Sequence, residues 1–269
     1  MSEPATTPGR WLEQTESGGT IQAPAHLWGF GALHGGLTLA ALTQAMRQVD
    51  DEDEDSVVRS VTGRLHRRIT GAFTITTTQP RHGRAAADAL DHATGTIKAS
   101  ASLVTSPARS TSFPVLAPCC PTAAPVDECE PFLVPPEFVP ISAFTQVRPV
   151  GPDRPYAGGE HPELTAWVRL TEDDRPPDLR RMIVLLDALA PSYAAILAVP
   201  YPIPTVELTV RPARQLDQAT SPWVLLHATT TSAAPDGWLH ERIDAFDPTG
   251  IHLASADQLR TVAPSSPTR

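Results

Sequence analysis

One stretch of this chain occurs twice, and the repeat limits the possible folds more than any other feature. Residues 88–101 read DALDHATGTIKASA and residues 244–256 read DAFDPTGIHLASA, with one residue fewer at the turn. The coinciding positions are Asp88 with Asp244, Asp91 with Asp247, Gly95 with Gly250, and the ASA triplets at 99–101 and 254–256. Self-similarity at a fixed offset indicates an internal duplication, so we expect two copies of one structural unit.

Both copies of this stretch have the pattern of a β-hairpin. Each Asp-to-Gly turn joins two runs of alternating polarity, at 84–91 with 96–105 and at 238–246 with 251–262. Upstream runs rich in Val, Thr and Ile favour further strands, at 57–69, 72–79, 205–212 and 223–231. Two more strand-like segments, 143–149 and 163–170, open the second half.

One helical segment precedes each set of strands. Apolar residues recur at helical spacing over 35–49. An acidic run follows at 50–55, where its charge opposes the negative end of the helix dipole, and we interpret this run as a solvated loop. The second helix begins near Asp178, a good N-cap after two prolines, and is disturbed at Pro191. Each half therefore reads strand, helix, then four antiparallel strands.

A proline-rich segment separates the halves. Residues 106–140 contain nine prolines, which predicts a linker or a meandering surface crossover between an N-terminal unit, 1–105, and a C-terminal unit, 141–269. A single helix can cover the apolar face of each antiparallel sheet, and pairing the two sheets edge to edge removes exposed edges. We expect an α+β protein with one continuous sheet.

Composition narrows the functional classes. A net charge of −9 argues against a broad basic face for nucleic acid. No apolar run approaches the roughly 18 residues of a membrane helix, and the polar N-terminus carries no signal segment, so we expect a soluble, cytoplasmic protein. Cys119, Cys120 and Cys129 fit neither a disulfide framework nor a zinc site, and we interpret them as loop thiols without a role.

The two halves differ in their polar residues. Aligning the ASA triplets places Gln258 opposite Leu103, and only the second helical segment carries an acidic residue, Asp187, inside an apolar run. A buried carboxylate must be hydrogen-bonded or have a raised pKa, and either condition suits a general base. The alternative is a carboxylate that caps the broken turn near Pro191 or pairs with an arginine such as Arg180.

Four segments carry a resemblance to a known family: GFGALHGGLTLAALTQAM (29–46), RHGRAAADAL (81–90), PTVELTVRP (204–212) and LASADQLRTV (253–262). They resemble the double-hot-dog acyl-CoA thioesterases of the type II, medium-chain bacterial class. The resemblance covers nearly the whole chain outside the proline-rich segment and the termini. It implies a tandem hot-dog fold, in which two antiparallel sheets each wrap a central helix and join into one sheet.

The same resemblance implies a catalytic trio in the second half, where an aspartate, a threonine and a glutamine bind and activate a water. Asp187 in LLDALAPS, Thr205 in PTVEL and Gln258 in ASADQL match these residues. Taken singly, Thr205 fits an ordinary β-branched strand residue and Gln258 a solvent-facing one. Their joint occurrence with Asp187 favours the catalytic interpretation.

We therefore expect an acyl-CoA hydrolase that releases a fatty or other carboxylic acid and free CoA from an acyl-CoA or acyl-carrier thioester. Backbone N–H groups of Gly35 and Gly36, at a helix N-terminus, are candidates for oxyanion stabilisation. His34 either assists by hydrogen bonding or is a helix-entry residue with a satisfied ring. We expect no metal and no cofactor apart from CoA as part of the substrate, no membrane or nucleic-acid partner, and a possible homo-oligomer.

Several other functional classes fit the sequence less well. GFGALHGG lacks the third glycine of a dinucleotide-binding loop, and no G-x-S-x-G elbow is present. A hot-dog enoyl thioester hydratase is the first alternative, although related hydratases pair an Asp and a His in a glycine-led segment and the sequence has no such local pair. A non-catalytic acyl-thioester binding protein is the second. Arginines 64, 67, 68, 81 and 84 are weak candidates for contacts with CoA phosphates.

Overall fold

Eleven strands form one antiparallel sheet in the computed structural model, which describes residues 6–15, 19–49, 56–109, 113–172 and 174–262. The first half contains α1 (Pro8–Gln14), β1 (Thr20–Ile21), α2 (Gly35–Val49), β2 (Ser56–Leu65), β3 (Phe73–Thr77), β4 (Arg84–Asp91) and β5 (Ile97–Pro107). The second half contains β6 (Thr145–Pro149), β7 (Glu163–Leu170), α3 (Leu179–Ala188), β8 (Thr205–Pro212), β9 (Val224–Ala233), β10 (Trp238–Phe246) and β11 (His252–Thr261).

The two halves join through their edge strands. The strand order is β1-β3-β4-β5-β2-β8-β11-β10-β9-β7-β6, so β2 and β8 meet at the centre of the sheet. Their register pairs Val61 with Val210 and Gly63 with Leu208. This pairing removes one exposed edge from each half. The expected tandem architecture, with one continuous sheet, is confirmed.

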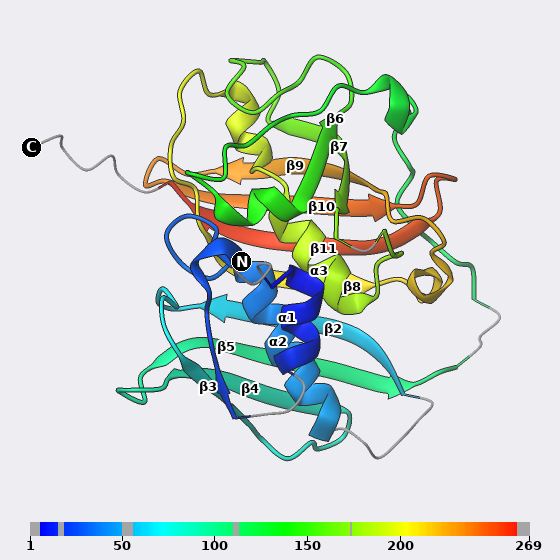
Figure 1. Ribbon diagram of the computed structural model, residues 1–269. Helices are drawn as coiled ribbons and strands as arrows, with labels where there is room; N and C mark the ends of the chain where they lie inside the picture. The colour runs from blue at the N-terminus through cyan, green and yellow to red at the C-terminus, as the bar shows by residue number, and fades with distance from the viewer. Residues whose placement is uncertain (1–5, 16–18, 50–55, 110–112, 173, 263–269) are drawn as a thin grey trace, which may run out of the picture.

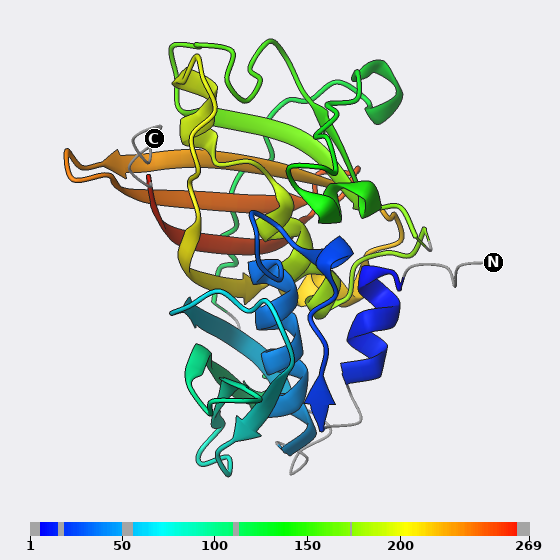
Figure 2. The ribbon, with the colours of Figure 1, turned by 60° about the vertical axis from the view of Figure 1, so that its left-hand side comes forward.

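Helices α2 and α3 lie on the same face of the curved sheet, and α1 lies beside α2 (Figure 1, Figure 2). Helix α3 begins at the predicted N-cap, where Asp178 Oδ1 accepts a 2.8 Å hydrogen bond from the Arg181 N–H. It ends at Ala188, because Leu189 is extended (φ −70°, ψ 135°) ahead of Pro191. None of the described helices is both long and apolar enough to cross a membrane.

The strand predicted over 57–69 ends early, at Leu65. Beyond it the backbone N–H groups of His66 and Arg67 both donate to Lys98 O at 2.9 Å, and the Leu33 N–H donates to Ile69 O at 2.8 Å. Residues 66–69 therefore leave the ladder to support the segment that enters α2. Alternating polarity in the sequence does not predict this early end of the strand. The end depends on the contact of Ile69 with Leu33, which lies far earlier in the chain.

The proline-rich segment crosses the outer face of the second half. The Trp167 Nε1–H donates to Ala124 O at 2.9 Å, and the Arg148 guanidinium donates to Val126 O and Cys129 O at 3.0 and 3.1 Å. Cys129 is buried in a small apolar cluster with Trp167, Leu225 and Phe246. The prediction of three loop thiols without a role is thus wrong for Cys129, which packs between the crossover and the sheet.

Candidate active site

The carboxylate of Asp187 lies at the junction of the two central helices. Its side chain is 6% exposed, and Oδ2 accepts a 2.7 Å hydrogen bond from the Gly36 N–H in the first turn of α2. The positive end of the α2 dipole favours a negative charge at this place. The alternative contacts predicted for Asp187 are not those observed, since Arg180 lies near Asp178, with 3.8 Å between Nη2 and Oδ2.

Two glycines allow this close approach. A Cβ at Gly36 would lie 2.9 Å from Val184 Cα and 3.0 Å from Ile183 O, so a side chain there would push α3 away from α2. A Cβ at Gly35 would lie 2.9 Å from Asp187 Oδ2. The glycines therefore make room for the second helix and its carboxylate.

Thr205 and Gln258 converge on the other carboxylate oxygen. Thr205 Oγ1 donates to Asp187 Oδ1 at 2.9 Å, and Gln258 Nε2 donates to the same oxygen at 3.2 Å. Thr205 begins β8 and Gln258 lies in the neighbouring strand β11, with both side chains directed towards α3. The structure thus brings together the three residues that the sequence singled out, from one helix and two strands. Their catalytic roles stay a prediction.

His34 comes from the other half of the chain and completes the cluster. Its Nε2 lies 3.5 Å from Asp187 Oδ2, its residue exposure is 7%, and Nδ1 is buried with no hydrogen-bond partner among the described residues. The ring is therefore not fully satisfied. The glycine-led segment around His34 contains no aspartate, but the pairing of the halves assembles an Asp-His contact.

The oxyanion assignment of Gly36 needs correction. Its N–H is engaged by Asp187 at 2.7 Å, so it is occupied in holding the carboxylate. Gly35, one residue earlier at the start of α2, is the remaining backbone candidate, and it lines the cavity beside Asp187. Sequence position alone gave no means of separating the two N–H groups.

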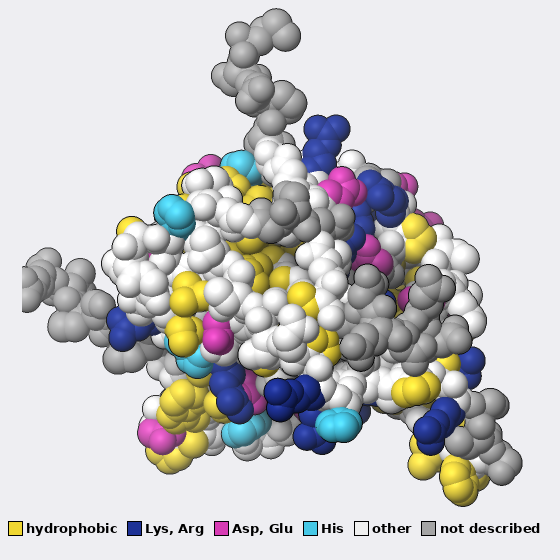
Figure 3. Space-filling model, turned by 90° about the horizontal axis from the view of Figure 1, so that it is seen from below, with side chains coloured by type: hydrophobic (Ala, Val, Ile, Leu, Met, Phe, Trp, Pro, Cys, Tyr) yellow, Lys and Arg dark blue, Asp and Glu magenta, His cyan; other side chains and the backbone are white. Residues whose placement is uncertain are grey.

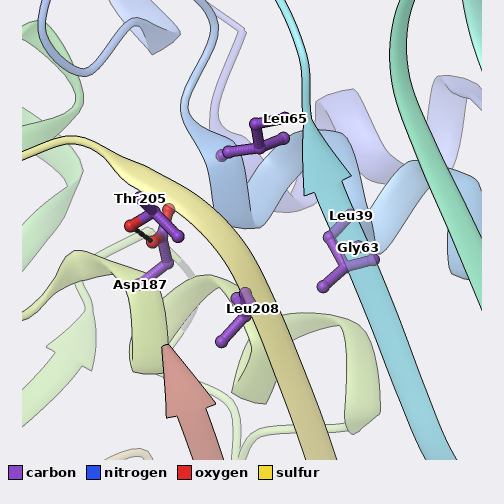
Figure 4. A pocket seen from close by; sticks show the side chains of 7 residues that line it. Leu39, Gly63, Leu65, Asp187, Thr205 and Leu208 are labelled. Atoms are coloured by element: carbon purple, nitrogen blue, oxygen red, sulfur yellow. Dashed lines mark hydrogen bonds between the residues drawn. The ribbon is translucent and has the colours of Figure 1, made fainter. Parts of the chain in front are cut away.

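A small cavity opens beside the carboxylate (Figure 4). It has a volume of about 10 Å³ and is lined by Gly35, Leu39, Gly63, Leu65, Asp187, Thr205 and Leu208. This is the space that the centre of one water molecule needs. Gln258 Oε1, buried in the same cluster, has no partner among the described residues and can accept a further hydrogen bond.

A buried ion pair that the sequence analysis missed lies behind the trio. Arg260, two residues after Gln258 on the same strand face, donates from Nε to Glu241 Oε2 at 2.7 Å, and the Ser192 N–H donates to Glu241 Oε1 at 2.5 Å. The two charged side chains are 5% and 1% exposed. The pair ties the segment after Pro191 to the sheet. The sequence signal for this ion pair is the presence of a charged residue, Glu241 or Arg260, at an inward-facing position of each strand.

Among the described residues of the first half, the positions that correspond to Thr205 and Gln258 are not polar. A β-bulge follows Val58 in β2 and Thr205 in β8, and Leu103 and Gln258 lie at matching distances from these bulges. The registers therefore make Val58 the counterpart of Thr205 and agree with the alignment of Leu103 with Gln258. Val58 is 5% and Leu103 is 1% exposed, so the corresponding place is filled by core side chains.

The N-terminus of α3, the counterpart of the α2 N-terminus, is covered by α1. The Gly9 N–H of α1 donates to Glu172 Oε1 at 2.6 Å, and Arg181 in the first turn of α3 pairs with Asp178 at 2.9 Å. A Cβ at Gly9 would lie 3.0 Å from Arg181 Nη2. Helix α1 thus closes the second possible site with structural contacts.

The charged side chains of the described residues are mixed in sign on one face of the molecule. On the face seen from below, basic side chains are interspersed with acidic ones and with histidines (Figure 3). Arg67 and Arg68 are exposed beside the segment that enters α2, whereas Arg64 pairs with Glu207 at 2.6 Å. Within the described ranges, no group of three or more His, Cys, Asp or Glu residues could hold a metal ion.

Comparisons with known proteins give a consistent result. Residues 121–262 match the acyl-CoA thioesterase C-terminal domain. A search of curated proteins finds no significant match. Three solved structures illustrate the similarity in fold. One is a conserved protein of unknown function with a hot dog fold from Alicyclobacillus acidocaldarius, with 18% identity, a TM-score of 0.81, and coverage of 95% of this chain and 98% of that chain.

The second is a candidate thioesterase II from Thermobifida fusca YX, with 22% identity, a TM-score of 0.73, and coverage of 91% and 92% of the two chains. The third is an acyl-CoA thioesterase II from Mycobacterium marinum, with 16% identity, a TM-score of 0.67, and coverage of 96% and 100%. Each similarity extends over both halves of this chain, so the hot-dog fold describes the whole of it.

Proposed function

Because the chain belongs to the acyl-CoA thioesterase family and is thus a thioester hydrolase, we propose that Asp187, Thr205 and Gln258 hydrolyse an acyl-CoA at a single site in the second half. The observation that carries this proposal is the convergence of three donors on one buried carboxylate. The Gly36 N–H, Thr205 Oγ1 and Gln258 Nε2 lie 2.7, 2.9 and 3.2 Å from its oxygens. Such a fixed, desolvated carboxylate suits a general base.

In the proposed reaction a water lies between Asp187 and Gln258. One O–H of this water donates a hydrogen bond to the Asp187 carboxylate, and the other donates a hydrogen bond to Gln258 Oε1, a buried acceptor with no other partner among the described residues. The water oxygen attacks the thioester carbonyl, and its proton passes to Asp187. The oxyanion is stabilised by the Gly35 N–H at the positive end of α2. Collapse of the tetrahedral intermediate breaks the C–S bond, and the proton on Asp187 passes to the departing thiolate.

Thr205 and the Gly36 N–H contact the carboxylate, so we assign them to its orientation. Thr205 Oγ1 has one proton, which it donates to Asp187 Oδ1. This hydrogen bond fixes the orientation of the Asp187 carboxylate. The reaction requires no cofactor, since coenzyme A enters as part of the substrate. The products are a carboxylic acid and free coenzyme A.

One observation favours a second candidate function. The 3.5 Å contact between His34 Nε2 and Asp187 Oδ2 is the kind of acid–base pair that an enoyl thioester hydratase needs. Two further donors, Thr205 and Gln258, are bound to the same carboxylate. A hydratase has no evident use for them, whereas a hydrolase uses them to position the base and the water. Hydrolysis is therefore the function that we propose.

The test is release of free thiol from a panel of acyl-CoAs, compared between the wild type and Asp187→Asn. We expect thiol release by the wild type and its loss in the variant. Asp257→Asn is the matched control, because Asp257 neighbours Gln258 on β11 but its side chain is 50% exposed and pairs with Arg211 outside the site. Hydration of crotonyl-CoA without thiol release would instead identify a hydratase. Tight acyl-CoA binding without either reaction would identify a binding protein.

A further inference from the structure

Two exposed arginines and an exposed phenylalanine lie beside the candidate active site, and the proposed reaction uses none of them. We infer that Arg67 and Arg68 bind the phosphates of the coenzyme A nucleotide and that Phe30 packs against its adenine ring. The enzyme thereby distinguishes an acyl-CoA from a thioester that has the same pantetheine arm without the nucleotide. The inference rests on the proposed function, because it concerns the carrier of the acyl group on which Asp187 acts.

The two arginines follow closely on a residue of the site. Leu65, the last residue of β2, contacts the start of α2, since a Cβ at Gly35 would lie 2.7 Å from Leu65 Cδ1. Leu65, Gly35 and Thr205 line the cavity beside the carboxylate and are half-buried, so the site reaches the surface at this place. Arg67 and Arg68 come two and three residues after Leu65 and are exposed.

Phe30 lies in a closed loop beside these arginines. The Gly29 N–H donates to Ala32 O at 2.9 Å, and we call the loop from Gly29 to Ala32 the entry loop. A Cβ at Gly31 would lie 3.8 Å from Arg68 Nη1, so the loop and the guanidinium group are neighbours. Phe30 is 58% exposed. Its aromatic face is therefore available to a ring of the substrate.

The entry loop also adjoins the carboxylate. A Cβ at Gly29 would lie 3.6 Å from His34 Cδ2, and His34 Nε2 lies 3.5 Å from Asp187 Oδ2. The Leu33 N–H donates to Ile69 O at 2.8 Å, which joins the chain after the loop to the chain after the arginines. The loop and the arginines therefore form one edge of the entrance to the site.

The charge of this region is opposite to that of the whole chain. The net charge is −9, but residues 56–87 contain six arginines and no aspartate or glutamate. Exposed charges are screened beyond about 8–10 Å at physiological salt, so an anion near the entry loop responds to its neighbours more than to the net charge. The local charge favours an anionic substrate group.

Arg67 and Arg68 are the arginines near the site whose charge is available. Neither forms an ion pair with a carboxylate among the described residues, whereas Arg64 pairs with Glu207 at 2.6 Å. Arg84 lies beside the other end of β2, as the registers of β4, β5 and β2 show. A guanidinium group binds phosphate oxygens through paired N–H groups, so these two residues suit a diphosphate.

The length of the pantetheine arm fits this arrangement. Between the sulfur and the diphosphate the arm has about a dozen bonds, which span about 15 Å when extended. Arg67 lies two residues beyond Leu65, at most about 7 Å along the backbone, and its side chain adds about 7 Å. A thioester carbonyl beside Asp187 therefore places the diphosphate within reach of Arg67 and Arg68.

The experiment compares one acyl group carried by coenzyme A and by pantetheine, in the wild type and in Arg67→Ala/Arg68→Ala. We expect the double variant to lower kcat/KM for acyl-CoA at least about tenfold, mainly through KM, because two charge-assisted contacts with phosphate are lost. The value for acyl-pantetheine should stay within about twofold, since this substrate has no phosphate. Phe30→Ala should lower kcat/KM for acyl-CoA about fivefold, again without an effect on acyl-pantetheine.

Arg47→Ala/Arg59→Ala is the matched control, because it removes the same charge from the first half. Arg47 is exposed in the last turn of α2, and Arg59 contacts Ser106 and Pro107 towards the other end of β2. The ratio of kcat/KM between the two carriers should stay within about twofold of the wild-type ratio. Added salt should raise the wild-type KM for acyl-CoA but not for acyl-pantetheine, since salt screens the contacts with phosphate.

A binding measurement separates the inference from the proposed function. Adenosine 3′,5′-bisphosphate, the nucleotide part alone, is titrated calorimetrically into Asp187→Asn and into Asp187→Asn that also lacks both arginines. Binding that disappears with the arginines supports the inference. Binding that persists without them, or equal losses for the two carriers in Arg67→Ala/Arg68→Ala, would overturn it, while thiol release by the wild type leaves the proposed function intact.

Two further outcomes are decisive. Without thiol release from either carrier the proposed function fails, and the titration alone then decides whether the nucleotide site exists. Faster hydrolysis of the same acyl group from an acyl carrier protein, with a loss in Arg67→Ala/Arg68→Ala, would assign the arginines to a protein carrier and overturn the nucleotide site.

Discussion

Replacement of Thr205 by valine tests the arrangement around Asp187 most directly. Valine keeps the β-branched shape but removes the hydroxyl that donates to Asp187 Oδ1 at 2.9 Å. The carboxylate is 6% exposed, so solvent has little access to replace the lost donor. A hydrogen bond to a charged group contributes about 1.5–3 kcal/mol, which corresponds to a roughly 10- to 150-fold loss of kcat at about 1.36 kcal/mol per tenfold.

The assay is steady-state thiol release from an acyl-CoA that the wild type hydrolyses, with far-UV circular dichroism and urea unfolding to verify the fold. We expect kcat to fall and KM to change little, because Thr205 holds the base. Thr205→Ser restores the hydroxyl and should recover most of the activity. Thr209→Val is the control, since Thr209 lies on the same strand and its hydroxyl contacts Thr62 Oγ1 at 3.0 Å. Unchanged kcat in Thr205→Val, or an equal loss in Thr209→Val, would refute the reasoning.

Three further predictions follow from the same cluster. Gln258→Ala should lower turnover more than about tenfold while the protein stays folded, because the water loses its second partner; unchanged thiol release would remove Gln258 from the mechanism. Leu103→Gln should not restore thiol release to Asp187→Asn, because the first half also has Val58 in place of Thr205; measurable rescue would contradict the single-site proposal. Gly36→Ala should destabilise the protein by up to about 2 kcal/mol in urea unfolding and reduce kcat, since overpacking against the Val184 backbone, 2.9 Å from the added Cβ, outweighs a helix-propensity gain of about 1 kcal/mol. Gly71→Ala, where nothing lies within 4 Å, is its control, and equal effects of the two changes would show that the helix contact is not limiting.

The sequence by itself determined the duplicated architecture. Alternating polarity and the repeated turn located both hairpins, and Asp178 and Gly35 marked the starts of the central helices as the structure has them. These features are local, because strand alternation and helix capping depend on residues within a few positions of one another. The repeat also reveals the asymmetry between Gln258 in the second half and Leu103 in the first.

The tertiary structure decided what each polar group touches. The contact between His34 and Asp187, the engagement of the Gly36 N–H, and the buried pair of Glu241 with Arg260 all join residues far apart in the chain. The size of the cavity under Leu39 likewise depends on how α2 packs over β2 and β8. Local patterns carry no information on such distances, because they arise only when the two halves pair and the central helices meet.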